Sequence, residues 1–168
     1  MPQIKIREWN EKQRTKLRFI KIGDIFCYQF SEEMFVFGQI LGKVNVGHVI
    51  QFFDIFQASP TITVEELSRA QFIGKPIIID SYTLFDRSPV WSWQIIGHQV
   101  DFDPSPFKDL AFKWGDPNGL QFGKVWLDGR TEPKIFSREE VEDLDWEACV
   151  GSIVYNRILE EELDKQMK

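Results

Sequence analysis

The stretch Phe19–Phe56, FIKIGDIFCYQFSEEMFVFGQILGKVNVGHVIQFFDIF, decides the fold that we expect of this chain. It contains three short runs dense in Phe, Ile, Val and Tyr, separated first by residues 31–33 and then by a glycine-bounded loop over residues 42–47. Runs of β-branched and aromatic residues divided by turn residues are typical of an antiparallel meander. The stretch therefore predicts three consecutive antiparallel strands.

Both faces of these strands are apolar. In the first run Phe26, Tyr28 and Phe30 alternate with Ile25, Cys27 and Gln29, and in the second Phe35, Phe37 and Gln39 alternate with Val36, Gly38 and Ile40. A sheet with one solvated face alternates apolar with polar residues, so this sheet is expected to be covered on both faces or to curl on itself. Gly38, inside the second run, predicts a bend or bulge.

The rest of the chain adds further strands and three helices. Strands are predicted at 77–79, 91–97 and 123–127, with a short pairing at 135–136 and a long ordered loop over 97–119. Capping boxes at Thr63 and Ser137 predict short helices over 64–71 and 138–145. A final helix over 150–166 would bury one stripe of side chains: Val150, Ile153, Val154 and Ile158. The fold class is therefore α+β, a curved, barrel-like antiparallel sheet of about six strands with two short helices and a C-terminal helix packed on it.

Length and composition favour one domain over residues 1–168, with 1–18 as a flexible or edge-strand lead-in in which Ile4 and Ile6 alternate. The N-terminal residues show no apolar signal-peptide core and no run is long enough for a membrane helix, so a soluble cytoplasmic protein is expected. Cys27 and Cys149 are interpreted as small buried hydrophobic residues. The net charge of −6 divides into +5 over residues 1–22 and −11 over the remainder. An acidic body of this kind favours a cationic partner over nucleic acid.

Catalytic signatures are absent: the sequence has no phosphate-binding loop, no nucleophile elbow, no H-E-x-x-H and no C-x-x-C. His48 and His98 lack a partner at ligand spacing, so structural roles are favoured over a general base. Asp101 and Asp103 resemble a pair of cation ligands, but the neighbouring prolines favour turn chemistry. We expect neither a metal nor a cofactor, and no enzymatic activity.

Two groups of residues are candidates for binding. Trp91 and Trp93 are predicted on one strand face, where they would be either core or a stacking platform for a base or sugar. Six carboxylates lie within nine residues and have no cation among them: Glu139, Glu140, Glu142, Asp143, Asp145 and Glu147. This acidic run is interpreted either as helix-dipole and solubility chemistry or as a docking surface for a basic protein.

Six segments in order resemble the immunity protein 26 family of bacterial polymorphic toxin systems: KIGDIF (21–26), MFVFGQIL (34–41), VIQFFDIF (49–56), KPIIID (75–80), WSWQIIG (91–97) and PSPF (104–107). The resemblance covers residues 20 to about 125. It implies a cytoplasmic, non-enzymatic protein that binds and neutralises a cognate toxin, often a nuclease with a basic surface. It carries over no individual contact residue. The alternative is a barrel-like module that binds a ligand or nucleic acid through Trp91, Trp93 and the basic N-terminus.

Overall fold

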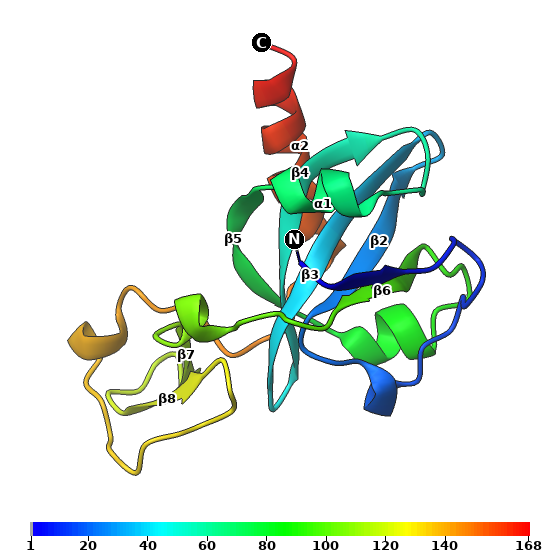
Figure 1. Ribbon diagram of the computed structural model, residues 1–168. Helices are drawn as coiled ribbons and strands as arrows, with labels where there is room; N and C mark the ends of the chain where they lie inside the picture. The colour runs from blue at the N-terminus through cyan, green and yellow to red at the C-terminus, as the bar shows by residue number, and fades with distance from the viewer. Residues whose placement is uncertain (1) are drawn as a thin grey trace.

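The computed structural model describes residues 2–168 and contains one six-stranded antiparallel sheet and one two-stranded sheet (Figure 1). The large sheet has the order β1-β6-β2-β3-β4-β5. Its strands are β1 (Ile4–Ile6), β2 (Asp24–Ser31), β3 (Met34–Val44), β4 (Gly47–Gln57), β5 (Phe72–Ile79) and β6 (Trp93–Gln99). The small sheet pairs β7 (Ala111–Gly115) with β8 (Phe122–Trp126). The two α-helices are α1 (Val64–Arg69) and α2 (Ser152–Gln166).

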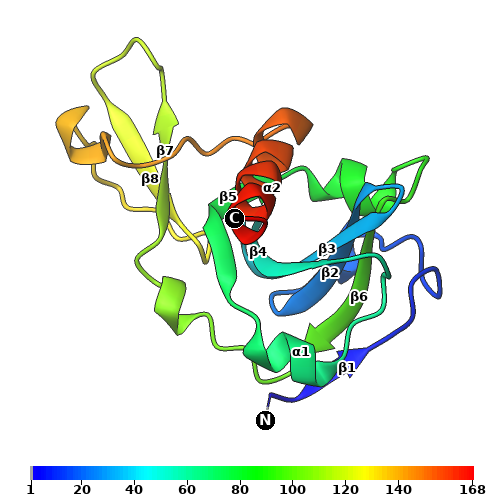
Figure 2. The same cartoon turned by 90° about the horizontal axis from the view of Figure 1, so that it is seen from above.

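The predicted meander is confirmed as β2-β3-β4, and both of its faces are buried. One face packs Phe26, Ile40 and Ile50 against Tyr155 and Leu159 of α2. The opposite face lies under Leu67 of α1 and the N-terminal strand β1 (Figure 2). The apolar pattern on both faces is thus explained by a cover on each side.

The sheet is curved but not closed into a barrel, because β1 and β5 remain separate edges. Register shifts occur beside Gly38 in β3, as the sequence predicted, and again between Ile40 and Gly42. A Cβ at Gly38 would overlap the Phe26 ring and the Gln51 carbonyl oxygen, so only glycine allows this close approach. The bulges explain the curvature without barrel closure.

A cluster of aromatic rings fills the core around Trp93. Its indole stacks on Tyr28 at 4.4 Å between ring centroids and meets Phe85 and Tyr155 edge to face. Trp93 is 1% exposed. The core therefore joins strand β6 to α2 and to the helical turn Tyr82–Asp86.

Several predicted elements need correction. The supposed loop over 97–119 contains the strand β7, and the loop over 42–47 is only the turn at Asn45-Val46, since β3 continues through the bulge at Gly42. The capping-box hydrogen bonds of Ser137 and Glu140 form, but the helix is a single 3₁₀ turn, η4 (Glu139–Val141). It stops there because residues 145–147 pair with β7 instead of continuing a helix.

The C-terminal helix exists as predicted, but its buried stripe was only partly right: Val150 and Ile158 pack against the core, and Ile153 and Val154 do not. Tyr155 and Leu159 face the sheet, whereas Ile153 is 76% exposed and Val154 is also exposed. The helix begins only at Ser152, so Val150 precedes it and packs from the connecting segment. Cys27 is buried as expected, but Cys149 is exposed because it lies in this connecting segment, where its thiol donates to Val46 O at 3.1 Å.

Candidate functional site

The strands β7 and β8 and the segment that follows them form a projection from the main sheet, here termed the hairpin lobe (residues 111–149). It lies to one side of the large sheet in both ribbon views (Figures 1 and 2). Phe112, Val125 and Leu127 anchor it by packing against Leu41 and Ile78 of the large sheet. The lobe therefore has a fixed position and presents its outer surface to solvent.

The acidic run lies on this lobe and is held in place by β7. Lys113 N donates to Asp145 O and Glu147 N donates to Lys113 O, both at 2.8 Å, so the end of the run pairs as a short strand. Val141, at 1% exposed, packs with Phe122 and Phe136 in a small core of the lobe. Because Val141 points inward, its acidic neighbours are directed outward.

Three of the six carboxylates have partners outside the run. Glu140 bonds Lys134 at 2.8 Å, Asp145 bonds Lys75 at 2.7 Å, and Glu147 accepts from Asn45 N at 3.2 Å. The Lys134 ammonium, with the Ser137 N–H, lowers the pKa of Glu140 to about 2. These three acids are therefore largely committed to the fold.

The other three carboxylates, on Glu139, Glu142 and Asp143, are exposed and make no ion pair or hydrogen bond with any residue in 2–168. None of the cations of the lobe forms an ion pair with these three carboxylates, and each of them lies over an aromatic ring. These pairs are Lys113 on Trp146, Lys124 and Lys134 on Phe136, Arg130 on Trp126 and Arg138 on Phe122. The lobe thus exposes three free carboxylates while its cations are held on rings.

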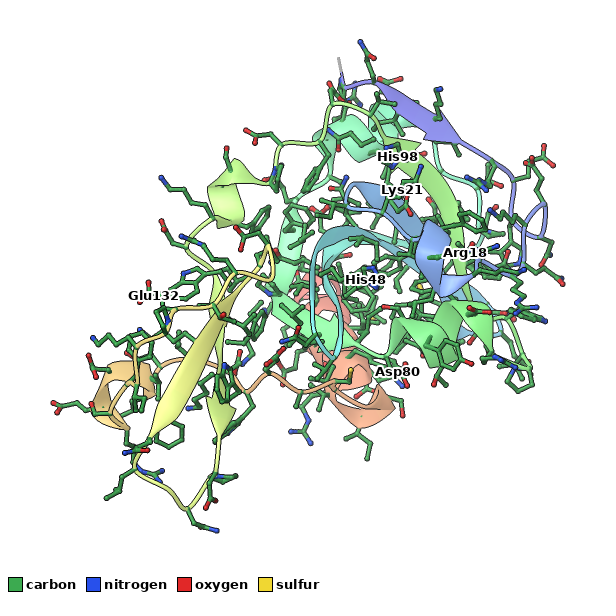
Figure 3. All side chains as sticks on the ribbon, turned by 90° about the horizontal axis from the view of Figure 1, so that it is seen from below. Arg18, Lys21, His48, Asp80, His98 and Glu132 are labelled. Carbon is green, nitrogen blue, oxygen red and sulfur yellow. The ribbon has the colours of Figure 1, made fainter. Side chains whose placement is uncertain are left out.

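Apolar side chains are also exposed on the lobe, and the sequence analysis missed them. Trp114 is 48% exposed, Ile135 62% and Leu120 79%. Trp114 and Ile135 line a pocket of about 460 Å³ together with Glu132, which Figure 3 shows on the lobe. The Trp114 indole lies directly on the backbone of its cross-strand partner Gly123, where a Cβ would overlap the ring. In the sequence, the one indication of this exposed ring is that Trp114 and Gly123 lie on either side of the turn at 116–119. Because residues 97–119 were predicted to be a loop, the two residues were not recognised as cross-strand partners.

The tryptophan platform does not form. Trp93 is in the core, and Trp91 precedes β6 with a φ of 51°, so the two do not share a strand face. Trp93 therefore has no free ring face for stacking on a base or sugar.

The histidines and the aspartate pair have structural partners. His48 is 2% exposed and its Nδ1 lies 2.9 Å from Ser81 Oγ, while His98 Nδ1 lies 2.9 Å from Asp24 Oδ1. Asp103 accepts from the backbone and hydroxyl of Ser105, which is the expected turn chemistry. Within residues 2–168 no group of three His, Cys, Asp or Glu side chains is arranged to hold a metal ion.

Comparison with known proteins assigns the family. The family model described as Immunity protein 26 matches residues 21–123, which is more than half of the chain. The protein belongs to the immunity protein 26 family, whose membership implies neutralisation of a cognate toxin by binding. The match ends at Gly123, before the acidic run. No curated protein and no solved structure matches the chain.

None of the helices in residues 2–168 combines the length and the hydropathy that a transmembrane span needs.

Proposed function

We propose that this immunity protein acts in the cytoplasm, without catalysis of its own, and neutralises a basic nuclease-type toxin domain by binding it through the hairpin lobe. The observation that carries the proposal is the trio of unpaired carboxylates Glu139, Glu142 and Asp143. They lie on a lobe that also exposes Trp114 and Trp146.

The unpaired trio is unfavourable in the free protein. Like charges that are adjacent or three to four residues apart repel one another, and no cation within 2–168 pairs with these three. A partner with Lys or Arg side chains would relieve this repulsion and gain charge-assisted hydrogen bonds. Such complementarity raises the association rate and disfavours wrong partners.

Besides charge complementarity, a stable interface needs apolar anchor residues, and the exposed rings of the lobe can supply them. Binding energy usually concentrates in a few desolvated Trp, Tyr and Arg side chains surrounded by polar contacts. Trp114 is already fixed against Gly123, so little side-chain entropy is lost when a partner covers it. The combination of a rigid ring and free carboxylates favours a protein partner over a small ligand at this surface.

The histidines support a binding role over a catalytic one. Burial, together with the Lys43 ammonium, lowers the pKa of His48 to about 4, and the ring is enclosed. His98 is engaged by Asp24. Neither histidine lies on the hairpin lobe.

The test is calorimetric titration of the protein against the toxin domain encoded beside it, using Glu139→Lys/Glu142→Lys/Asp143→Lys. The matched control is Glu160→Lys/Glu161→Lys/Asp164→Lys, which makes the same charge change on exposed positions of α2. We expect the lobe variant to lose about a hundredfold or more in affinity while the control loses less than about fivefold.

Equal losses in the two variants would mean that net charge, and not the lobe, governs binding. Unchanged binding by the lobe variant would move the interface elsewhere, and absence of binding by the unaltered protein would refute the pairing with that toxin.

A further inference from the structure

A second surface feature lies on the main sheet, at the end where β2 begins and β6 ends. It is a pocket of about 320 Å³, and its wall includes Arg7, Lys12, Thr15, Lys21, Asp24 and His98. Figure 3 shows Lys21 and His98 on this part of the molecule, well separated from Glu132 of the hairpin lobe. This pocket therefore plays no part in the proposed toxin-binding surface.

Three cations meet at this pocket and none of them forms an ion pair within residues 2–168, although the Lys12 ammonium lies 5.7 Å from the centroid of the Phe19 ring. Arg7, Lys12 and Lys21 make no side-chain ion pair or hydrogen bond with any residue that the structure describes. The chain has 26 acidic residues and 20 lysines and arginines, so an acidic partner for each cation was available in the composition. Their unpaired convergence marks a local positive field on an acidic protein.

One carboxylate, that of Asp24, opposes this field, but both of its oxygens are engaged. Oδ1 lies 2.9 Å from His98 Nδ1, and Oδ2 accepts from Lys21 N at 2.7 Å. Asp24 is 5% exposed, so its charge lies in the floor of the pocket. The lining of the pocket carries three cations and one acid, so its net charge is about +2 before His98 is counted.

A buried hydroxyl without a partner lies in the same wall. Thr15 is 3% exposed and its Oγ1 is the one buried side-chain polar atom in residues 2–168 that makes no hydrogen bond. Buried polar groups are normally satisfied, and an unsatisfied one requires an explanation. Thr15 lines the pocket, so a shift of its side chain toward the cavity would let this hydroxyl donate to an oxygen of a ligand.

We propose that this pocket binds the phosphate group of a small phosphorylated ligand such as a nucleoside monophosphate. A phosphate dianion balances the net positive charge, and its oxygens accept hydrogen bonds from guanidinium, ammonium and hydroxyl groups together. The pocket volume exceeds that of a bare anion and lies at the lower end of the range, about 300–1,000 Å³, of small-molecule sites. Phe19, 48% exposed at the pocket, offers an apolar edge to the body of such a ligand.

The test is titration of the full chain at about 0.15 M salt with inorganic phosphate, with adenosine monophosphate and with adenosine, followed by calorimetry or by NMR of the backbone amides. We expect binding of both phosphates and none of adenosine, with amide shifts at Lys21 and His98. Tighter binding of the nucleotide than of phosphate would identify a nucleotide-like ligand, and equal binding would identify the phosphate alone as the recognised group.

Two variants locate the binding. Lys12→Gln/Lys21→Gln is expected to weaken phosphate binding by about tenfold or more, whereas Lys108→Gln/Lys168→Gln, with the same charge change at exposed positions outside the pocket, leaves it unchanged. Thr15→Val is expected to weaken binding and yet raise the melting temperature of the free protein, because it removes the unsatisfied hydroxyl.

The proposal is overturned if neither phosphate binds the unaltered protein. It is also overturned if the control loses as much affinity as the pocket variant, or if an oligonucleotide binds while both small phosphates do not.

Discussion

The buried imidazole of His48 should make the stability of the protein depend on pH between 7 and 5. Its ring is 2% exposed on β4, opposite Lys43 of β3. Burial and then the Lys43 charge lower its pKa from 6.5 to about 4. The Ser81 hydroxyl donates to Ile79 O at 3.4 Å, so its oxygen is free to accept from Nδ1–H of the neutral ring.

The sign and size follow from proton linkage. Between the pKa of the unfolded ring and that of the folded ring, the unfolded state binds more protons, so the free energy of unfolding falls as the pH falls. With pKa values of 6.5 and about 4, the loss between pH 7 and pH 5 is about 2 kcal/mol. Above about pH 8 both states are neutral at this ring and the contribution is constant.

The assay is urea unfolding at several pH values for the unaltered protein and for His48→Asn. The substitution itself costs stability at every pH, and His98 is present in both proteins, so only the difference in slope reports His48. We expect the unaltered protein to lose about 2 kcal/mol more than His48→Asn between pH 7 and pH 5. Parallel curves over this interval would refute the reasoning and show that His48 titrates alike in the folded and unfolded chain.

Three further predictions concern the fold and are tested by chemical unfolding. Gly38→Ala should lower the free energy of unfolding by about 1–3 kcal/mol or more, because the new Cβ overlaps Phe26 and the Gln51 carbonyl. Gly151→Ala is the control and should change it little, since a Cβ there has no atom within 4 Å. Equal losses would argue against the close approach at Gly38. Thr63→Ala should cost about 1 kcal/mol by removing the capping box with Glu66. Leu159→Ala should lower the free energy of unfolding by about 2–5 kcal/mol, and Ile153→Ala by less than about 0.5 kcal/mol. The reverse order would mean that Ile153 is buried, as the sequence predicted.

The main sheet could be predicted because its signals are local and strong. Alternation at Ile25–Phe30 placed side chains on two faces, the Ile77–Ile79 run indicated a strand buried on both, and the Thr63 capping box located a helix start to the residue. Each of these follows from the geometry of one strand or one turn. None requires knowledge of a distant partner.

The errors arose where a distant partner decides the structure. The strand β7 is five residues long beside a Gly- and Pro-rich turn, and it exists because β8 and Trp146 pair with it. The apolar residues of α2 fit more than one helical stripe, and contact with Trp93 and Tyr28 selects Tyr155. Lys75 lies 70 residues from Asp145, so the partial neutralisation of the acidic run was not visible in its own sequence.

Only the charged part of the candidate surface could be predicted from the sequence. The acidic residues were expected to be accessible, and Glu139, Glu142 and Asp143 are. Trp114 and Ile135 were not expected to be exposed on the same lobe, because their placement depends on the pairing of β7 with β8. The sequence thus indicated the charge of the surface and the fold supplied its apolar part.

The charge of the chain as a whole does not explain the recognition that we propose for the lobe at physiological salt. The Debye length is then about 8 Å, so charges separated by more than this are largely screened. The basic N-terminal residues and the acidic end of α2 both lie away from the lobe (Figures 1 and 2). In the proposed complex these charges would act on an approaching toxin at low salt and would contribute little after docking at physiological salt. Discrimination among toxins therefore depends on the groups that touch the partner, which is why reversing three charges on the lobe and three on α2 should have unequal effects.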